Sequence, residues 1–162
     1  MTVSCTLALI LSSFLAQTQK AHQHGTAQIN VAMEGTKGEL EFESPADGIL
    51  GFEHAPKTAA QKKTTTDVLA KFKTQAGTLF EFPAAAGCTL TPKEVEIHRE
   101  GPQHAEVHAH YAVACKTAPT GQLTLGVFKA YPRLSTIAVT VLSGSQQSAA
   151  QATPAKATVK LN

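Results

Sequence analysis

The segment from His104 to Cys115 constrains the fold more than any other part of the chain, because its polar and apolar residues alternate. Successive side chains of a β-strand point to opposite faces of the sheet. Read as a strand, the segment has an apolar face formed by Val107, Ala109, Tyr111, Val113 and Cys115. The opposite face carries His104, Glu106, His108 and His110. The pattern therefore predicts a strand with one buried face and one histidine-rich face.

The histidine-rich face predicts metal binding. Neighbouring side chains on one face of a strand are roughly 6.5–7 Å apart, so two imidazoles can converge on one ion. Imidazole nitrogens are good ligands for divalent transition metals. The alternative is the solvent-exposed face of an edge strand whose polar residues deter aggregation, but Glu or Lys would serve that purpose equally well. Three histidines in this row favour the metal site.

Length and composition indicate one exported domain. The 162 residues suffice for a single compact domain, and a net charge of +2 gives no reason to expect a nucleic acid partner. An uncharged apolar run from Leu7 to Leu15 has the length of a signal-peptide core and is too short to span a bilayer. We therefore expect a signal peptide over residues 1–21, a domain over residues 22–162 without a membrane span, and a periplasmic location. The alternative for the first residues is a buried strand.

Cysteine usage agrees with export. Cys5 lies in the expected signal peptide, which leaves Cys88 and Cys115 as an even pair. In an oxidising compartment such a pair predicts a disulfide. The alternative, two thiolate metal ligands, is disfavoured because Cys115 falls on the apolar face, opposite the histidines.

Alternation elsewhere predicts an α+β fold built mainly on an antiparallel sheet. Two strands ending near Met33 and Glu43 are expected to form a hairpin, with Glu39, Glu41 and Glu43 on a solvated face. One longer helix is expected at about residues 58–75, and a short second helix near residues 128–134. Further strands are expected at 79–82, 88–97, 123–127, 136–142 and 156–161. Residues 49–56 are expected to form a loop, and residues 143–154, which are rich in Ser, Gln and Ala, a flexible connection.

The remaining histidines are weaker candidates for metal ligands. His22 and His24 form a second His-x-His pair near the start of the expected domain, and His54 lies alone in a loop before Pro56. A solvated tail and a turn residue are the simpler interpretations of these two sites. Glu53, beside His54, is expected to be solvated. His98 has the weakest case.

No motif for nucleophilic catalysis or phosphate binding is present. The sequence lacks the serine hydrolase elbow, a glycine-rich phosphate loop and the zincin motif His-Glu-x-x-His. A binding function is therefore favoured over an enzymatic one.

Five segments together resemble a known family. They are His22-Gln23-His24-Gly25 with the alternating residues after it, Glu43-Ser44-Pro45-Ala46, Gly51-Phe52-Glu53-His54-Ala55-Pro56, Ala85-Ala86-Gly87-Cys88 and His104-Ala105-Glu106-Val107-His108. In this order they resemble the ZrgA-type zinc-uptake proteins of Gram-negative bacteria. The resemblance implies a periplasmic zinc-binding protein that serves a zinc import system. Many members carry a long His-, Asp- and Glu-rich insertion before the last segment, of which only residues 100–103 remain here.

The resemblance and the residue pattern together predict the ligands. The family's histidines fall on His22, His24, His54 and His104, with Glu106 in the strand motif, and His108 matches a histidine of some members. The preferred Zn(II) ligand set is His24, His54 and His108, followed by His104 and Glu106, with His22 and His110 as further candidates.

Three other functions stay open at this point. One is a mononuclear zinc hydrolase or hydratase, in which Glu106 is the evident acid or base. Another is a copper-binding protein, since Cu(II) binds nitrogen sites more tightly than zinc does. The third is a structural or adhesive β-domain without a metal.

Overall fold

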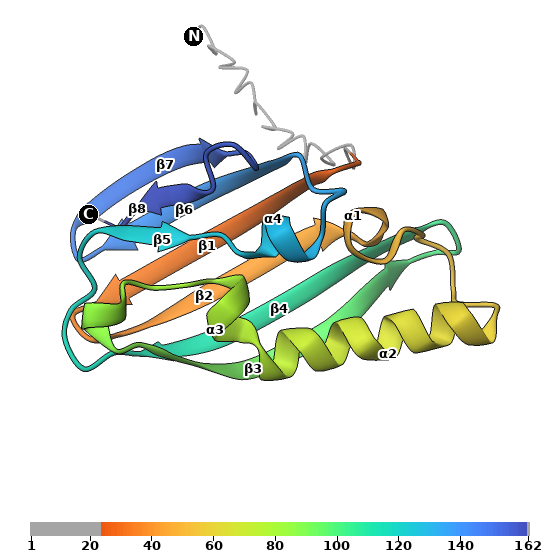
Figure 1. The fold of residues 1–162 in the computed structure, drawn as a ribbon, viewed down its shortest axis with the longest axis horizontal. Coiled ribbons are helices and arrows are strands. Elements are labelled where there is room, and N and C mark those ends of the chain that lie inside the picture. Colours follow the sequence, from red (N-terminus) through yellow and green to blue (C-terminus); the bar gives the residue numbers. More distant parts are fainter. Residues whose placement is uncertain (1–23, 162) are drawn as a thin grey trace, which may run out of the picture.

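A six-stranded sheet forms the centre of the protein, which we describe from a computed structural model over residues 24–161. The strand order is β3-β4-β2-β1-β6-β7, and a two-stranded sheet of β5 and β8 lies beside it (Figure 1). The strands are β1 (Thr26–Glu34), β2 (Lys37–Pro45), β3 (Thr89–Glu100), β4 (His104–Ala114), β5 (Gln122–Thr124), β6 (Thr136–Ser143), β7 (Gln146–Ala152) and β8 (Thr158–Lys160). The helices are α1 (Ala46–Leu50), α2 (Ala59–Thr74), α3 (Ala76–Leu79) and α4 (Val127–Ala130), with a 3-10 turn at Ala84–Ala86. The α+β prediction is confirmed.

Strand pairing in the large sheet is mixed. β1 and β2 form the predicted antiparallel hairpin, and β4 pairs antiparallel with both β2 and β3. β1 pairs with β6 in parallel. Parallel neighbours need a long crossover connection, and here the chain from β2 to α4 supplies it. The sheet is therefore mostly antiparallel, with one parallel pair.

The helices cover one face of the large sheet (Figure 1). On that face Phe42, Phe72, Phe80 and Tyr111 are all completely buried, and the rings of Phe42 and Phe72 lie 5.3 Å apart. The hydroxyl of Tyr111 donates a 2.9 Å hydrogen bond to the carbonyl of Phe72. Because this face holds the core, the other face of β2, β3 and β4 is free to carry charged residues.

Helix α2 confirms the predicted longer helix to within one residue at each end. Its first turn has a capping box, in which the Thr58 side chain accepts a hydrogen bond from the Gln61 backbone and the Gln61 side chain accepts one from the Thr58 backbone. Val68 and Phe72 form its buried stripe. The hydroxyls of Thr65 and Thr66 donate hydrogen bonds to the carbonyls four residues earlier.

Three segments differ from the prediction. Residues 143–154, expected to be a flexible connection, contain strand β7, an edge strand whose residues are exposed except Ala152. Its backbone hydrogen bonds with β6 make it a strand, although it has no apolar alternation that could show this. Leu79, expected to begin a strand, ends helix α3, and Glu81 forms only an isolated bridge with Thr124. The expected loop at residues 49–56 begins inside helix α1, which ends at Leu50 and is capped by Gly51 with a φ of 84°.

The predicted disulfide is present. Cys88 and Cys115 are bonded, which joins the start of β3 to the end of β4 on the side of the core. Within residues 24–161, no helix is both long and apolar enough to cross a bilayer. The expected signal peptide and His22 lie outside the described residues.

Candidate metal centre

The outer face of β2, β3 and β4 is covered by histidine and glutamate side chains. In β4, the exposed or half-buried His104, Glu106, His108 and His110 alternate with buried Ala105, Val107, Ala109 and Tyr111, as predicted. The register places Glu43 and Glu96 on either side of His108, and Glu41 and Glu94 on either side of His110. Paired residues of an antiparallel ladder point to the same face. The three strands therefore present imidazoles flanked on both sides by carboxylates.

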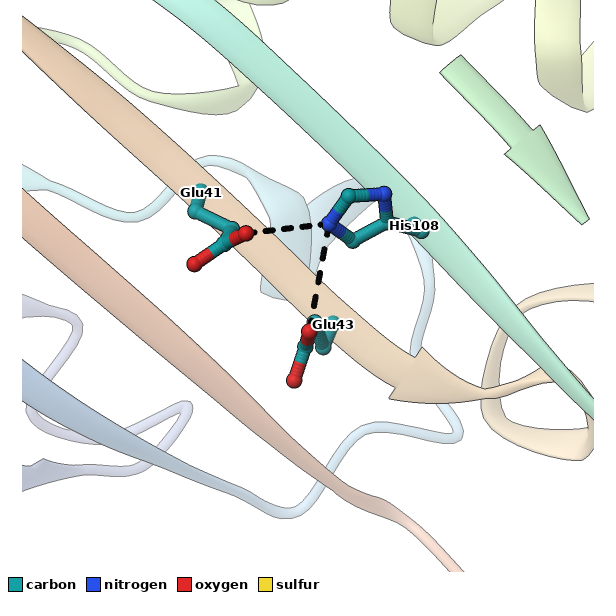
Figure 2. A group of neighbouring side chains, drawn as sticks. All are labelled: Glu41, Glu43 and His108. Atoms are coloured by element: carbon teal, nitrogen blue, oxygen red, sulfur yellow. Dashed lines mark hydrogen bonds and ion pairs between the residues drawn. The ribbon is translucent and has the colours of Figure 1, made fainter. Parts of the chain in front are cut away.

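Glu41, Glu43 and His108 form the cluster with the most suitable geometry for a metal ion (Figure 2). His108 Nε2 lies 3.1 Å from Glu41 Oε1 and 3.8 Å from Glu43 Oε1. One ligand atom from each residue lies within 4.8 Å of the other two, and among residues 24–161 no other His, Cys, Asp or Glu group of three does so. The His108 side chain is 21% exposed. The cluster is open to solvent but held on two rigid strands, and we call it the sheet-face site.

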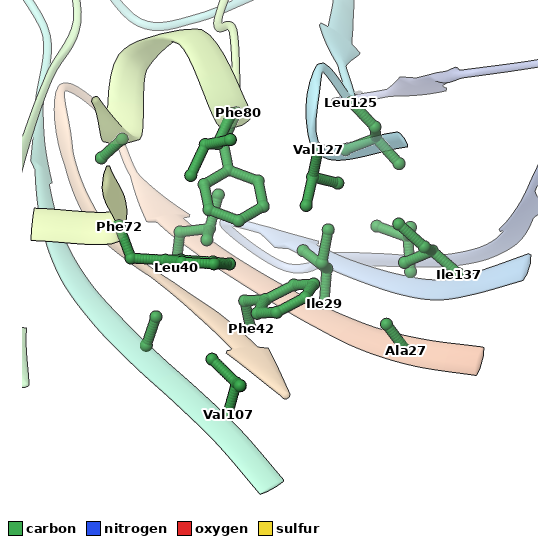
Figure 3. Packing of buried hydrophobic residues seen from close by; sticks show 14 of the residues in the cluster. Ala27, Ile29, Leu40, Phe42, Phe72, Phe80, Val107, Leu125, Val127 and Ile137 are labelled. Carbon is green, nitrogen blue, oxygen red and sulfur yellow. The ribbon is translucent and has the colours of Figure 1, made fainter. Parts of the chain in front are cut away.

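The core side of β2 explains why its glutamates face outward. Leu40 and Phe42 point into the hydrophobic core together with Ile29 and Val107 (Figure 3), and both are fully buried. Because side chains alternate along a strand, burying Leu40 and Phe42 directs Glu39, Glu41 and Glu43 to the outer face. The same core contacts therefore position the carboxylates of the sheet-face site.

His110 and Glu39 form a neighbouring pair that already has a positive partner. His110 Nε2 is 3.1 Å from Glu39 Oε2, and the ammonium of Lys93 donates a 2.7 Å hydrogen bond to Glu39 Oε1. The hydrogen bonds from Lys93 and then His110 lower the pKa of Glu39. This carboxylate is therefore neutralised by a lysine, which makes it a poorer metal ligand than Glu41 or Glu43.

A second group surrounds Glu53 at the end of the sheet where β2 finishes and β4 begins. His24 Nδ1 lies 3.3 Å from Asp47 Oδ2 and 3.8 Å from Glu53 Oε1, and His104 Nδ1 lies 3.5 Å from Glu53 Oε2. The Glu53 side chain is only 12% exposed, so the expectation that it is solvated is wrong. We call His24, Asp47, Glu53 and His104 the sheet-end cluster.

His54 lies in a different environment from the other candidate histidines. Its Nδ1 is 2.8 Å from the carbonyl of Ala55, and its ring stacks on Phe52 with centroids 5.4 Å apart. The preferred set of His24, His54 and His108 is thus distributed over three separate surroundings. It stays a prediction, as do the roles of Glu106 and His22.

Four acidic residues of these clusters were not among the predicted ligands. Glu41, Glu43 and Glu53 were expected to be solvated, and no role was expected for Asp47. A usable signal existed for the first two, since a Glu row on the strand next to a His row on the same face brings the two together. No such signal existed for Asp47, whose position depends on the unpredicted helix α1.

The arrangement has the chemistry of a cation-binding surface. Zinc bound tetrahedrally at about 2.0–2.2 Å from nitrogen and oxygen ligands separates those ligand atoms by about 3.3 Å. The 3.1 Å and 3.8 Å separations at the sheet-face site are close to this value. Two carboxylates would also balance the charge of a divalent ion.

Comparison with known proteins gives one family. Residues 21–161 match the family model described as "ZrgA family zinc uptake protein". None of the curated proteins matches the chain.

Proposed function

Because the chain belongs to the ZrgA family of zinc uptake proteins, we propose that it is an exported protein that binds Zn(II) reversibly and passes it to a membrane importer. Zinc uptake is not an enzymatic activity, and the proposed role is that of a carrier. The zinc ion is its cargo. The periplasm is the compartment in which the carrier acts.

The observation that carries the proposal is the convergence of Glu41, Glu43 and His108. One imidazole nitrogen and two carboxylate oxygens supply three ligands of the kinds that zinc accepts. The separations of 3.1 Å and 3.8 Å from His108 Nε2 are within about half an ångström of the roughly 3.3 Å expected between ligand atoms of a tetrahedral ion. The ion would replace the hydrogen bond that now joins His108 to Glu41.

Reversible binding follows from the number and type of these ligands. Structural zinc sites are closed by four ligands, many of them thiolates, whereas three protein ligands leave one coordination position open. Here both cysteines of the described chain are used in the disulfide. The open position would hold water, which a ligand from the importer can displace. The exposure of Glu41 and Glu43 keeps that position accessible.

Export is supported by two independent features. An apolar run from Leu7 to Leu15 has the length of a signal-peptide core. The Cys88–Cys115 bond is of a kind that persists in oxidising compartments such as the bacterial periplasm.

Zinc titration calorimetry on the disulfide-intact chain tests the proposal. We expect tight zinc binding in the wild type, and loss of the sheet-face ion in an E41Q/E43Q double variant, which keeps the size of both side chains. His54→Ala separates this site from the ligand set predicted from sequence. Loss of zinc in His54→Ala with normal binding in E41Q/E43Q would reject the sheet-face site and support His24, His54 and His108.

A further inference from the structure

The two edges of the large sheet differ in their protection against pairing with another chain. Natural edge strands are protected by prolines, by bulges and by charged side chains. β3, at one edge, has all three, since it contains Pro92, a register shift between Pro92 and Glu94, and charges along its length. Those charged residues are Lys93, Glu94, Glu96, Arg99 and Glu100. β7, at the other edge, has none of these features within its seven residues (Figure 1).

β7 is a regular and uncharged edge strand. All seven of its residues pair with β6 without a register shift. Its sequence is Gln-Gln-Ser-Ala-Ala-Gln-Ala, and no charged residue occurs between Arg133 and Lys156. Every residue of the strand except Ala152 is exposed. Because an outermost strand presents backbone N–H and C=O groups along its free side, β7 is a template for the addition of another strand.

The composition of β7 favours a second copy of this chain as that added strand. A two-fold axis brings the same residues of both copies together, so a charged edge would repel itself, whereas an uncharged edge does not. Antiparallel pairing about Ala149 places each Gln147 opposite Gln151 of the partner subunit. Glutamine amides both donate and accept hydrogen bonds, so these side chains can bond to each other. The strand is therefore complementary to itself in charge and in hydrogen bonding.

A hollow beside β7 provides space for packing on the core side of the sheet. It has a volume of about 260 Å³, and its lining includes Val141, Ser148 and Leu161. Ser148 lies opposite Val141 in the ladder between β7 and β6. In the antiparallel arrangement Ser148 also lies opposite Ala150 of the partner subunit, whose side chain points to the same face. The second copy thus adds apolar surface next to this hollow.

We propose that the protein forms a two-fold symmetric dimer in which the β7 strands of two copies pair antiparallel about Ala149. The two six-stranded sheets then form one continuous sheet. β6 and β1 separate β7 from β2, so the sheet-face site of each copy stays open in the dimer, and the dimer does not depend on zinc binding. Pairing of seven residues is small beside the roughly 1,600 Å² buried in a standard stable interface, so the dimer is expected to dissociate on dilution.

Sedimentation equilibrium of the disulfide-intact chain over a wide range of micromolar concentrations tests the dimer. The mass of the wild type is expected to rise with concentration from that of one chain toward that of two. Ala149→Lys changes an exposed residue and places two ammonium groups opposite each other at the axis. Its dissociation constant is expected to be at least about tenfold higher. Ala32→Lys makes the same change at an exposed position of β1 and is expected to associate as the wild type does.

Mixing oppositely charged variants tests the two-fold arrangement itself. Ala149→Glu alone is expected to associate as weakly as Ala149→Lys, because like charges again face each other. An equimolar mixture of the two is expected to form dimers, since opposite charges then meet at the axis. Recovery in the mixture also shows that both variants are folded. A wild type that keeps the mass of one chain at every concentration would overturn the proposal, as would undiminished association of Ala149→Lys or a mixture that does not associate.

Discussion

His108 Nε2 lies 3.1 Å from Glu41 Oε1, although the strand register places Glu43 and not Glu41 directly opposite His108. The imidazole thus reaches diagonally along β2 and lies between two carboxylates of the same face. A slip of one residue between β2 and β4 would send the glutamates to the opposite face. Because Leu40 and Phe42 are completely buried, such a slip is strongly opposed by the core.

Removing the imidazole of the sheet-face site is expected to weaken zinc binding there. His108→Ala deletes the only nitrogen ligand of that cluster, and we expect its affinity to fall by more than about tenfold. Calorimetry measures the change. His98→Ala, on the same face of the adjacent strand, is the control and should bind as the wild type does. Equal affinities in His108→Ala and wild type would contradict the assignment.

Zinc affinity is expected to decrease as the pH is lowered. Only the neutral imidazole binds a metal, and histidine side chains as a class titrate near pH 6.5, so protons compete with zinc between pH 7.5 and 5.5. A site with one histidine ligand should lose about tenfold in affinity over this range. Titrations at several pH values, corrected for buffer binding, measure the slope. An affinity that stays constant would exclude a histidine ligand.

Removing the disulfide is expected to lower stability without affecting zinc. Cys88 and Cys115 close a loop of 27 residues, and a Cys88→Ala/Cys115→Ala variant should lose about 3–4 kcal/mol in free energy of unfolding. Denaturant titration measures this loss. The bond packs against the core, on the opposite side of β4 from His108, so zinc stoichiometry at a temperature where the variant is folded should be unchanged. A lost ion would indicate that the bond helps to shape a metal site.

Alkaline pH is expected to destabilise the fold through two buried tyrosines. Burial raises the pKa of Tyr131 to about 12 and the pKa of Tyr111 still further above its ordinary value of 10.0. Above about pH 10 the unfolded chain releases these protons while the folded chain retains them, so the free energy of unfolding falls as the pH rises. Denaturant titrations from pH 8 to 11.5 should show the fall, and Tyr131→Phe should reduce its slope. A slope equal to that of the wild type would place the cause elsewhere.

Local patterns in the sequence were sufficient for much of the fold. Alternation correctly predicted the outward-facing glutamates of β2 and both faces of β4, and the helix expected at about residues 58–75 matches α2. Strand β7 was not predicted from the sequence. It is an edge strand with only one buried residue, so no periodicity distinguishes it from a loop. Helix α1 was not predicted either, because its five residues are too few to show a helical period.

The candidate sites, like the fold, have features that the sequence predicts and features that only the tertiary structure decides. The sequence by itself determined that His104, His108 and His110 share one face of a strand, because the side of a strand follows from residue spacing alone. It also determined the family and the two cysteines that form the disulfide. Only the tertiary structure decided which acids meet which histidines, since Glu41 and His108 are 67 residues apart in the chain. Their contact depends on the order β3-β4-β2 and on a register imposed by the core. Glu53 comes near His24 and His104 in a loop whose backbone accepts a hydrogen bond from Arg99 of β3. Such long-range contacts leave no periodic trace in the sequence, because they are selected by packing between elements and not by the conformation of any one of them.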